Sequence, residues 1–474
     1  MQRSIKLGLF ALMWASPAAT QTFERLAPAT RGFVSVPEPV VALTNVRVID
    51  GTGAPARDAQ TIIIENGRIA RIGASASVSA PAGARVIDLN GHTVIPGIVG
   101  MHDHTFYTTS RRSIQSNFSF PRLYLASGVT TIRTTGSMSP YSELNLKKRI
   151  EAGEVPGPRM HVTGPYISGD GAGGGMYEVG TPEDARRVVN YWVKEGATWF
   201  KFYTSITREE MKAAIDEAHK HGVKLTGHLC SVGYREAVAL GIDALEHGLF
   251  ANSEYDANKT PDKCPSTMSA SHAALDVNSP EVKATFAEMV RNNVAMTSTL
   301  AVYELFVPNR PPELDARMLD AMSPETKEEY LATRKRLAEN PSAASSPAVF
   351  KKAMEYERAF VAAGGLLAAG VDPTGNGGAL PGFGDQRNHE LLVEAGFSPV
   401  ESIRIMTLNG AKVLGVDKDL GSIEPGKVAD LAVVRGNPAV NPADIRNTTL
   451  VFKDGIGYDS AKLIAAVKGT IGIR

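Results

Sequence analysis

The feature that most constrains this chain is an apolar run, from Val94 to His104, that ends in a His-x-His pair. Such a run is typical of a buried strand, in which side chains two residues apart point to the same face. His102 and His104 would then project together from the end of the strand, while Asp103 points away. Two imidazoles on one rigid strand suit a zinc-like metal ion. Alone, the pair is equally compatible with two ordinary polar residues at a strand end.

The sequence after residue 96 alternates between strand and helix patterns through eight strands. This alternation predicts an α/β fold, a (β/α)8 or TIM barrel, whose active site lies at the C-terminal ends of its strands. Six polar side chains fall at or near those ends, on strands one, four, five, six and eight. They are His102, His104, Lys201, His228, His247 and Asp372. Their shared placement predicts a metal site at that end of the barrel.

Lys201 stands out because it lies inside an apolar strand, between Phe200 and Phe202. Lysine is rarely buried without a partner, and an exposed lysine at a strand end is the alternative. In a metal site, a lysine that carbon dioxide has carboxylated at N6 becomes an anionic oxygen ligand that can bridge two metals. Tyr203 shares the face of Lys201, so its hydroxyl is a candidate for substrate contact, with barrel packing as the alternative. His389 follows strand eight and is a further candidate, again against a purely structural role.

The segments that flank the barrel follow a different pattern. Residues 1–20 resemble a signal peptide, with a basic start, a short apolar stretch and small residues for cleavage, which implies a periplasmic or secreted protein. Residues 21–95 alternate as strands, with Asn66-Gly67 typical of a tight hairpin turn. Residues 411–474 return to this strand pattern. We therefore expect a β-sandwich built from residues 21–95 and 411–474, beside a barrel over residues 96–410.

The charge balance and the cysteine content limit the kinds of partner and compartment that we expect for this chain. The chain has 50 Lys+Arg and 50 Asp+Glu residues, so no charge excess argues for nucleic acid or for an anionic membrane surface. After removal of the signal segment, no apolar run is long enough to span a bilayer. A small-molecule substrate is expected, and self-association stays open. The two cysteines, Cys230 and Cys264, are predicted to form a disulfide, because both would lie at one barrel face in an oxidising compartment.

With these motifs in hand, the sequence resembles the amidohydrolase superfamily, in its prolidase-like and imidazolonepropionase-like branch. The matching motifs cover nearly the whole mature chain, and they include Val94-Ile-Pro-Gly, Gly128-Val-Thr-Thr, Gly157-Pro-Arg, Gly227-His228, Glu246-His247-Gly248, Gly370-Val-Asp372 and Gly421-Ser-Ile-Glu-Pro-Gly. The resemblance implies a binuclear zinc site. His102, His104 and Asp372 would bind one metal, His228 and His247 the other, and carboxylated Lys201 would bridge them.

One departure from the family pattern concerns the substrate. Many relatives carry Gly-Gly-His after strand three, where this chain has Gly173-Gly-Gly-Met176. The expected activity is hydrolysis of an amide or peptide-like C–N bond, in a dipeptide or N-acyl amino acid, by a hydroxide that bridges two metals. Asp372 would then act as the proton shuttle. Hydrolysis of an ester, lactone or phosphotriester at the same site is the alternative, and a metal-free binding protein on this fold is a remote one.

Overall fold

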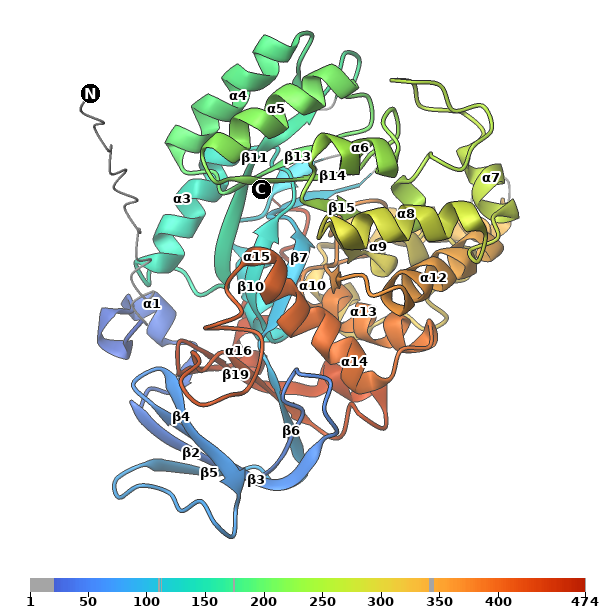
Figure 1. Cartoon of the computed structure of the whole chain (residues 1–474). Helices are drawn as coiled ribbons and strands as arrows, with labels where there is room; N and C mark the ends of the chain where they lie inside the picture. Colours follow the sequence, from blue (N-terminus) through green and yellow to red (C-terminus); the bar gives the residue numbers. More distant parts are fainter. Residues whose placement is uncertain (1–20, 110, 112, 174, 341–344, 474) are drawn as a thin grey trace, which may run out of the picture.

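A computed structural model describes residues 21–109, 111, 113–173, 175–340 and 345–473 (Figure 1). The expected signal segment, residues 1–20, lies outside these described residues. Among them, no helix is both long enough and apolar enough to cross a membrane.

Eight parallel strands form the central barrel-like layer, in two hydrogen-bonded sheets. Their bounds are β7 (Ile98–Asp103), β10 (Val129–Thr134), β11 (Arg159–Ser168), β13 (Trp199–Phe202), β14 (Lys224–Gly227), β15 (Ala244–Glu246), β16 (Ala295–Ser298) and β17 (Leu367–Ala369). One sheet runs β14-β13-β11-β10-β7, with the two-residue β12 (Tyr177–Glu178) beside β11, and the other runs β15-β16-β17. This arrangement fits the predicted TIM-barrel-like domain.

Two backbone hydrogen bonds close the gaps between the two sheets. The amide of Asp243, just before β15, donates to the carbonyl of Leu225 in β14. The amide of Asp372, just past β17, donates to the carbonyl of His102 in β7 over 2.7 Å. The second bond ties the last barrel strand to the first, and it joins two of the predicted ligands through the main chain.

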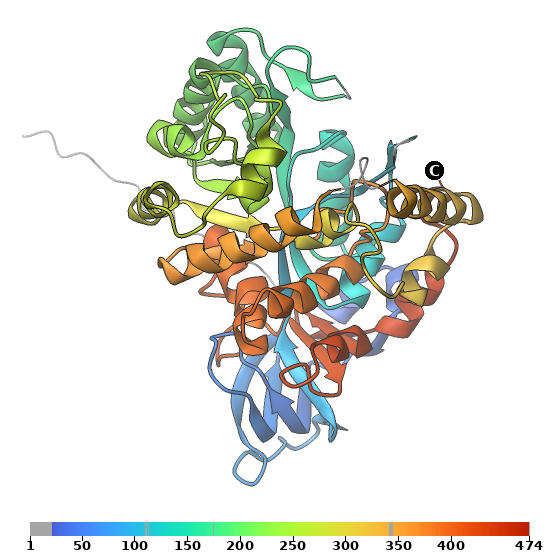
Figure 2. The same ribbon diagram turned by 90° about the vertical axis from the view of Figure 1, so that its right-hand side faces the viewer.

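Helices cover the outside of the barrel (Figures 1 and 2). Those between or after its strands are α2 (Ser119–Ala126), α3 (Pro140–Glu151), α4 (Pro182–Glu195), α5 (Arg208–Lys220), α6 (Tyr234–Leu240), α8 (Pro280–Arg291), α12 (Pro347–Ala362), α13 (Phe383–Glu394), α14 (Pro399–Arg404) and α15 (Gly410–Leu414). Local chemistry sets their limits. Thr207 begins α5 with a capping box, and Gly196 ends α4 with φ of 108°, which glycine adopts without strain.

Further short elements lie at the C-terminal end of the barrel strands and in the insertions between strands and helices. They are the hairpin β8 (Phe106–Thr108) and β9 (Ser113–Gln115), and the helices α7 (Met268–Ala274), α9 (Leu300–Glu304), α10 (Ala316–Ala321) and α11 (Pro324–Glu339). α9 follows β16 directly, so its side chains reach the same end of the barrel as the predicted ligands.

The predicted β segments at both ends of the chain combine in a single nine-stranded sheet, at the bottom of Figure 1. Its strands are β1 (Val34–Val36), β2 (Val40–Val48), β3 (Arg57–Glu65), β4 (Arg68–Ala74), β5 (Arg85–Asp88), β6 (His92–Pro96), β18 (Leu431–Arg435), β19 (Thr448–Lys453) and β20 (Ile456–Asp459). β6 pairs antiparallel with β18, which joins the two segments. Two short helices, α1 (Pro28–Arg31) and α16 (Ser460–Ala466), flank this region.

The apolar run from Val94 to His104 differs from the single strand expected. It forms two strands, β6 in the nine-stranded sheet and β7 in the barrel, which are separated by Gly97. A Cβ on Gly97 would lie 2.1 Å from the Thr130 hydroxyl, so only glycine fits where the chain passes between the two layers. The run is buried on both sides of this break, although its two halves belong to different sheets.

Candidate metal centre

The structure brings the six predicted residues together at one end of the barrel. His102 lies in β7 and Lys201 in β13, while His104, His228, His247 and Asp372 follow the ends of β7, β14, β15 and β17. All are buried except His228, which is half-buried and faces the cleft described below. His247 and Asp372 have positive φ values of 69° and 49°, a strained conformation for residues other than glycine and one that clusters at functional sites.

The Asp372 carboxylate is the hub of the cluster. Its Oδ1 lies 3.3 Å from Nε2 of His104, and its Oδ2 lies 3.6 Å from Nε2 of His102 and 3.9 Å from Nδ1 of His247. Ligand atoms of His102, His247 and Asp372 all lie within 4.8 Å of one another, a spacing that could hold a metal ion.

Lys201 and His228 complete the cluster on its other side. The Lys201 Nζ lies 3.0 Å from Nε2 of His102. The imidazole of His228 has its centroid 4.3 Å from that of His247 and 4.8 Å from that of the Tyr203 ring. The six side chains therefore form one contiguous group rather than two separate sites.

Hydrogen bonds to surrounding residues fix the ring orientation of three of the four histidines. The Nδ1–H of His102 donates to the Glu246 carboxylate over 2.7 Å, and the Nδ1–H of His104 donates to the Gly136 carbonyl over 3.2 Å. The Nδ1 of His247 hydrogen bonds with the Thr299 hydroxyl over 2.7 Å. Each ring is thereby held from its Nδ1 side, which is how metal-binding histidines are commonly oriented.

Glu246 is the functional residue that reasoning from strand ends missed. Its carboxylate is fully buried and also accepts hydrogen bonds from Arg133 in β10 and from Thr226 in β14. Burial alone would raise the pKa of Glu246, but Arg133 and His102 lower it to about 2. A carboxylate that is ionised at neutral pH thus holds the tautomer of His102. The Glu246-His247-Gly248 motif was the available signal, but it pointed only to the histidine.

Burial leaves this donor set in the protonation state that a cation needs. It lowers the pKa of His104 to about 4 and that of His228 to about 3, so both rings are neutral at pH 7. Burial would raise the pKa of Asp372, but the neighbouring His102 and His104 hold it well below its usual range. Burial lowers the pKa of Lys201 to about 8, which makes the neutral amine accessible near neutral pH.

One ring nitrogen of the cluster lacks a hydrogen-bond partner, which bears on whether the residues fit a metal ion. The Nε2 of His247 is buried and has no hydrogen-bond partner among the described residues. A buried polar nitrogen without a partner costs free energy, and a cation at this position would satisfy it. Together with neutral imidazoles and an ionised carboxylate, this residue set fits a divalent metal.

A cleft of about 360 Å³ opens onto the cluster and is lined by Lys201, His228 and Asp372. Tyr203 lines it too, as the shared strand face predicts. His389 does not reach the cleft, and the expected substrate contact is corrected here. Its ring is fully buried in α13, where its Nδ1 hydrogen bonds with the Ser402 hydroxyl over 2.9 Å. The residue lies within α13, and its side chain packs toward α14.

Cys230 and Cys264 are joined in a disulfide, with their Cα atoms 4.9 Å apart. Cys230 lies two residues after His228 and is buried. The bond therefore ties the loop that follows β15 to the end of β14, next to the cluster.

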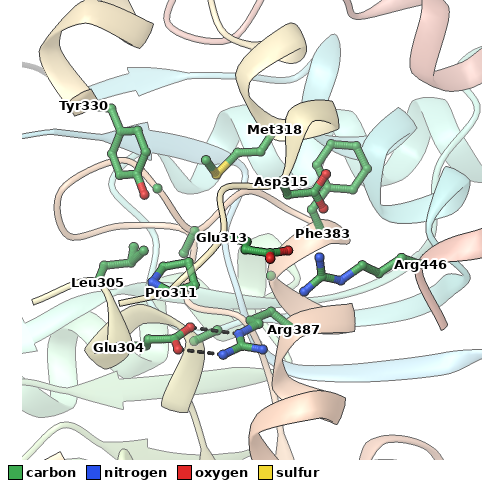
Figure 3. Close-up of a pocket in the computed structure, with 14 residues that line it drawn as sticks. Glu304, Leu305, Pro311, Glu313, Asp315, Met318, Tyr330, Phe383, Arg387 and Arg446 are labelled. Atoms are coloured by element: carbon green, nitrogen blue, oxygen red, sulfur yellow. Dashed lines mark hydrogen bonds and ion pairs between the residues drawn. The ribbon is translucent and has the colours of Figure 1, made fainter. Parts of the chain in front are cut away.

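A second, smaller cavity of about 50 Å³ lies beside α9 and holds none of the six residues (Figure 3). Its arginines are already paired. Arg387 donates to Glu304 over 2.7 Å, and Arg446 donates to Glu390 over 2.6 Å. Because these charges are satisfied within the protein, the cluster at the barrel end remains the candidate site.

Comparison with known proteins agrees with this geometry. The model of the amidohydrolase family matches residues 93–261 and 329–457, which together make up more than half of the chain. The chain belongs to the amidohydrolase family. The matched segments contain all six clustered residues, so the family pattern and the barrel-end cluster coincide.

Solved structures of other amidohydrolase-like proteins resemble nearly the whole chain. A putative prolidase from Bifidobacterium longum is 26% identical with a TM-score of 0.66, over 91% of this chain and 99% of that one. A Xaa-Pro dipeptidase with bound methionine in its active site is 22% identical with a TM-score of 0.67, over 89% and 100% of the two chains, a likeness that shows the fold.

Among curated proteins the match is short. Adenine deaminase 4 of Rhizobium meliloti (strain 1021) is 38% identical over 66 residues, which is 14% of this chain and only 11% of that relative's length. Family membership and the hydrolases among these neighbours support a hydrolase that acts on carbon–nitrogen bonds, as the sequence predicts.

Proposed function

We propose that this protein is an exported hydrolase that uses two zinc ions to cleave an amide or peptide-like C–N bond of a small molecule. The observation that carries the proposal is the convergence of four histidines, Asp372 and Lys201 in one cluster at the barrel end, onto which the cleft opens. The prolidase-like neighbour at 26% identity favours a peptide-like bond, in a dipeptide or an N-acyl amino acid.

The assignment of ligands is the one that the resemblance to the amidohydrolase superfamily implies, and the proximity of the six side chains supports it. His102, His104 and Asp372 would hold one metal, and His228 and His247 the other. Lys201, carboxylated at N6, would bridge the two. The lowered pKa of Lys201, caused by burial, supports this modification because only the neutral amine reacts with carbon dioxide. When bound, such metals supply a Lewis acid for the substrate carbonyl and a hydroxide at neutral pH.

The protein's own groups then carry the remaining steps. Asp372, ionised and next to the cluster, accepts the proton of the attacking water at a carboxylate oxygen and delivers it to the leaving nitrogen. The Tyr203 hydroxyl, at the cleft wall, can donate a hydrogen bond to the substrate carbonyl. Burial raises the pKa of Tyr203, so this hydroxyl keeps its proton near neutral pH. Glu246 keeps His102 in one tautomer throughout.

Elemental analysis of the purified protein, combined with an activity screen after zinc loading, tests this function. We expect a stoichiometry near two metals per chain and hydrolysis of blocked or free dipeptides or N-acyl amino acids that stops on chelation. Metal content near zero together with full activity after chelation would contradict the proposal.

Export is a separate part of the proposal. The disulfide between Cys230 and Cys264 supports it, because such bonds persist in oxidising compartments. N-terminal sequencing of the protein recovered from a periplasmic or culture fraction tests it, with cleavage near residue 20 as the expected result.

A further inference from the structure

The residues that line the cleft indicate a class of substrate, which the metal ligands alone do not. Five aromatic side chains line it, Phe106, Tyr166, Tyr203, Tyr303 and Phe306. They come from β8, β11, the end of β13, and α9 with the residues that follow it. Met138, Met176 and Val302 add further apolar surface. Aromatic and thioether groups contribute most of their binding energy through burial of apolar ligand surface.

Packing behind the walls holds several of these rings in place. The Tyr166 and Tyr203 rings meet edge to face with centroids 5.5 Å apart, and Tyr303 stacks on Phe250 with centroids 3.8 Å apart. Such fixed rings form a preorganised surface, so a ligand pays little to order them.

Two glycines make room for the same rings. A Cβ on Gly136 would lie 2.4 Å from the Tyr166 ring, and a Cβ on Gly375 would lie 3.1 Å from the Phe306 ring. Both glycines have positive φ values, 89° and 74°, which side chains rarely adopt. The backbone on each side of the cleft therefore approaches the aromatic wall as closely as it can.

The charges of the cleft are confined to the metal cluster. Among its described lining residues, the only acids, lysines, arginines or histidines are Lys201, His228 and Asp372, all assigned to the metals. The other polar groups are hydroxyls of tyrosines and of Thr108 and Thr374. A free dipeptide carries an ammonium and a carboxylate next to its scissile bond. Both would lose water here without a charged partner of their own, which is costly.

We propose, on the basis of the function proposed above, that the substrate is uncharged on both sides of its scissile amide and places an aromatic group against Tyr303 and Phe306. The hydroxyls of the cleft hydrogen bond its neutral polar atoms, and the aromatic and methionine walls cover the rest. Within the peptide-like class proposed above, the preferred substrates are thus amides with blocked or aryl-bearing ends, rather than free dipeptides or N-acyl amino acids, whose ends are charged.

Three substrates with the same type of scissile bond test this proposal. They are N-acetyl-phenylalanyl-alanine amide, the free dipeptide phenylalanyl-alanine, and N-acetyl-alanyl-alanine amide. We expect kcat/KM for the first to exceed that for each of the others by at least about 10-fold, as burial of one ring and loss of two charges imply. A free dipeptide that is cleaved as well as its blocked form overturns the proposal and leaves the hydrolase function standing. Hydrolysis of none of the three, nor of any other amide by the zinc-loaded protein, overturns both.

Phe306→Ala locates the aromatic subsite, and Phe306→Leu provides a second variant that retains apolar bulk. We expect Phe306→Ala to reduce the preference for the phenylalanyl over the alanyl substrate by about 10-fold, with a smaller reduction for Phe306→Leu. A fall in both rates by the same factor indicates a structural role and overturns the assignment. Phe118→Ala is the matched control, because this ring is 54% exposed and does not line the cleft.

Binding provides a readout that does not depend on turnover. Calorimetric titration uses protein from which a chelator has removed the metal. N-acetyl-phenylalanine amide should bind with a dissociation constant at least about 10-fold lower than that of free phenylalanine. Equal affinity for the two ligands, or tighter binding of the free amino acid, contradicts the proposal.

Discussion

At the scale of single residues, the candidate site depends on charges that are buried but individually matched. Lys201 is 2% exposed and lies between two tyrosine rings, with its Nζ 5.1 Å from the centroid of Tyr166 and 6.0 Å from that of Tyr203. The charges that act on it are those of the Asp372 and Glu246 carboxylates, which favour the ammonium, and of Arg133, which opposes it. The side chain therefore belongs to the buried cluster and does not form a surface ion pair.

Substitution of Lys201 by alanine tests that role. We expect Lys201→Ala to lose bound metal and to lower kcat by at least about 100-fold, because the bridging oxygen ligand is missing. Added acetate or propionate should restore part of both, since a short carboxylic acid can occupy the vacated space. Metal analysis and initial rates measure the two effects. Normal metal content and turnover in the variant would rule out the bridging role.

Glu357 is a second buried residue, and it lies outside the metal cluster. Its titration should change the stability of the protein with pH. Burial raises the pKa of its carboxyl from 4.5 to about 8. Between these values the folded protein retains a proton that the unfolded chain releases. The free energy of unfolding should therefore fall as pH rises from about 5 to 8, by up to about 1.4 kcal/mol per pH unit, and level off above.

Glu357→Gln removes this titration, so its unfolding free energy should depend less on pH than that of the unaltered protein. Urea unfolding at pH 5 and pH 8 provides the comparison. Glu355→Gln, on the same helix but with a side chain 41% exposed, is the control. Identical pH dependence in Glu357→Gln and the unaltered protein would exclude Glu357 as the source.

At the scale of the elements, the contact between β17 and β7 determines whether the cluster can form. A Cβ on Gly370, next to β17, would lie 2.1 Å from the backbone nitrogen of His102. No side chain can move aside to relieve this overlap because the contacting atom is backbone. The first and last barrel strands approach each other only because residue 370 is glycine.

Gly370→Ala should therefore separate β17 from β7. We expect a loss of at least about 2 kcal/mol in unfolding free energy, together with weaker metal binding, because Asp372 and His102 move apart. Thermal unfolding and metal titration measure the two effects. Gly32→Ala is a matched control, since residue 32 has helical φ and its Cβ would meet only the Ala29 carbonyl oxygen, at an ordinary van der Waals distance of 3.7 Å. Unchanged stability in Gly370→Ala would show that the strands can shift without cost.

The sequence predicts strand ends well because alternation and flanking glycines are local signals. It placed His228 and His247 correctly at the ends of β14 and β15 because each follows a short strand-like segment next to a glycine. It could not reveal Glu246 as the anchor of His102, since that contact joins residues 144 apart in sequence. The break at Gly97 is hidden from the sequence because both halves of the run are apolar and buried, so the pattern does not show that they join different sheets.

At the scale of the whole molecule, the disulfide links the stability of the fold to the metal cluster. Cys230 and Cys264 are 34 residues apart, and a loop of this length corresponds to roughly 3–4 kcal/mol in the chain-entropy description. The linked loop leaves the barrel beside His228 and His247. Loss of the bond would therefore affect both global stability and the mobility of the cleft rim.

We expect reduction to lower the free energy of unfolding by about 2–4 kcal/mol. The Cys230→Ser/Cys264→Ser double variant should be destabilised to a similar extent and should not respond to reductant, which makes it the control. Urea unfolding with and without dithiothreitol measures the difference. Alkylation of both cysteines in unfolded protein that was never reduced would exclude the bond.

The nine-stranded sheet also sets an order of events for the nascent polypeptide. β6 leaves the ribosome before any barrel strand, yet its antiparallel partner β18 is synthesised only after all of them. In the interval β6 is held by a short parallel ladder to β2, Arg47–Thr93 and Val48–Val94, and its other edge is unpaired. Such an edge is a site of aggregation. A translation product arrested between β17 and β18 should therefore depend on chaperones, whereas a circular permutant that begins just before β18 and joins β20 to β1 by a linker would bring the partner strands together early in synthesis.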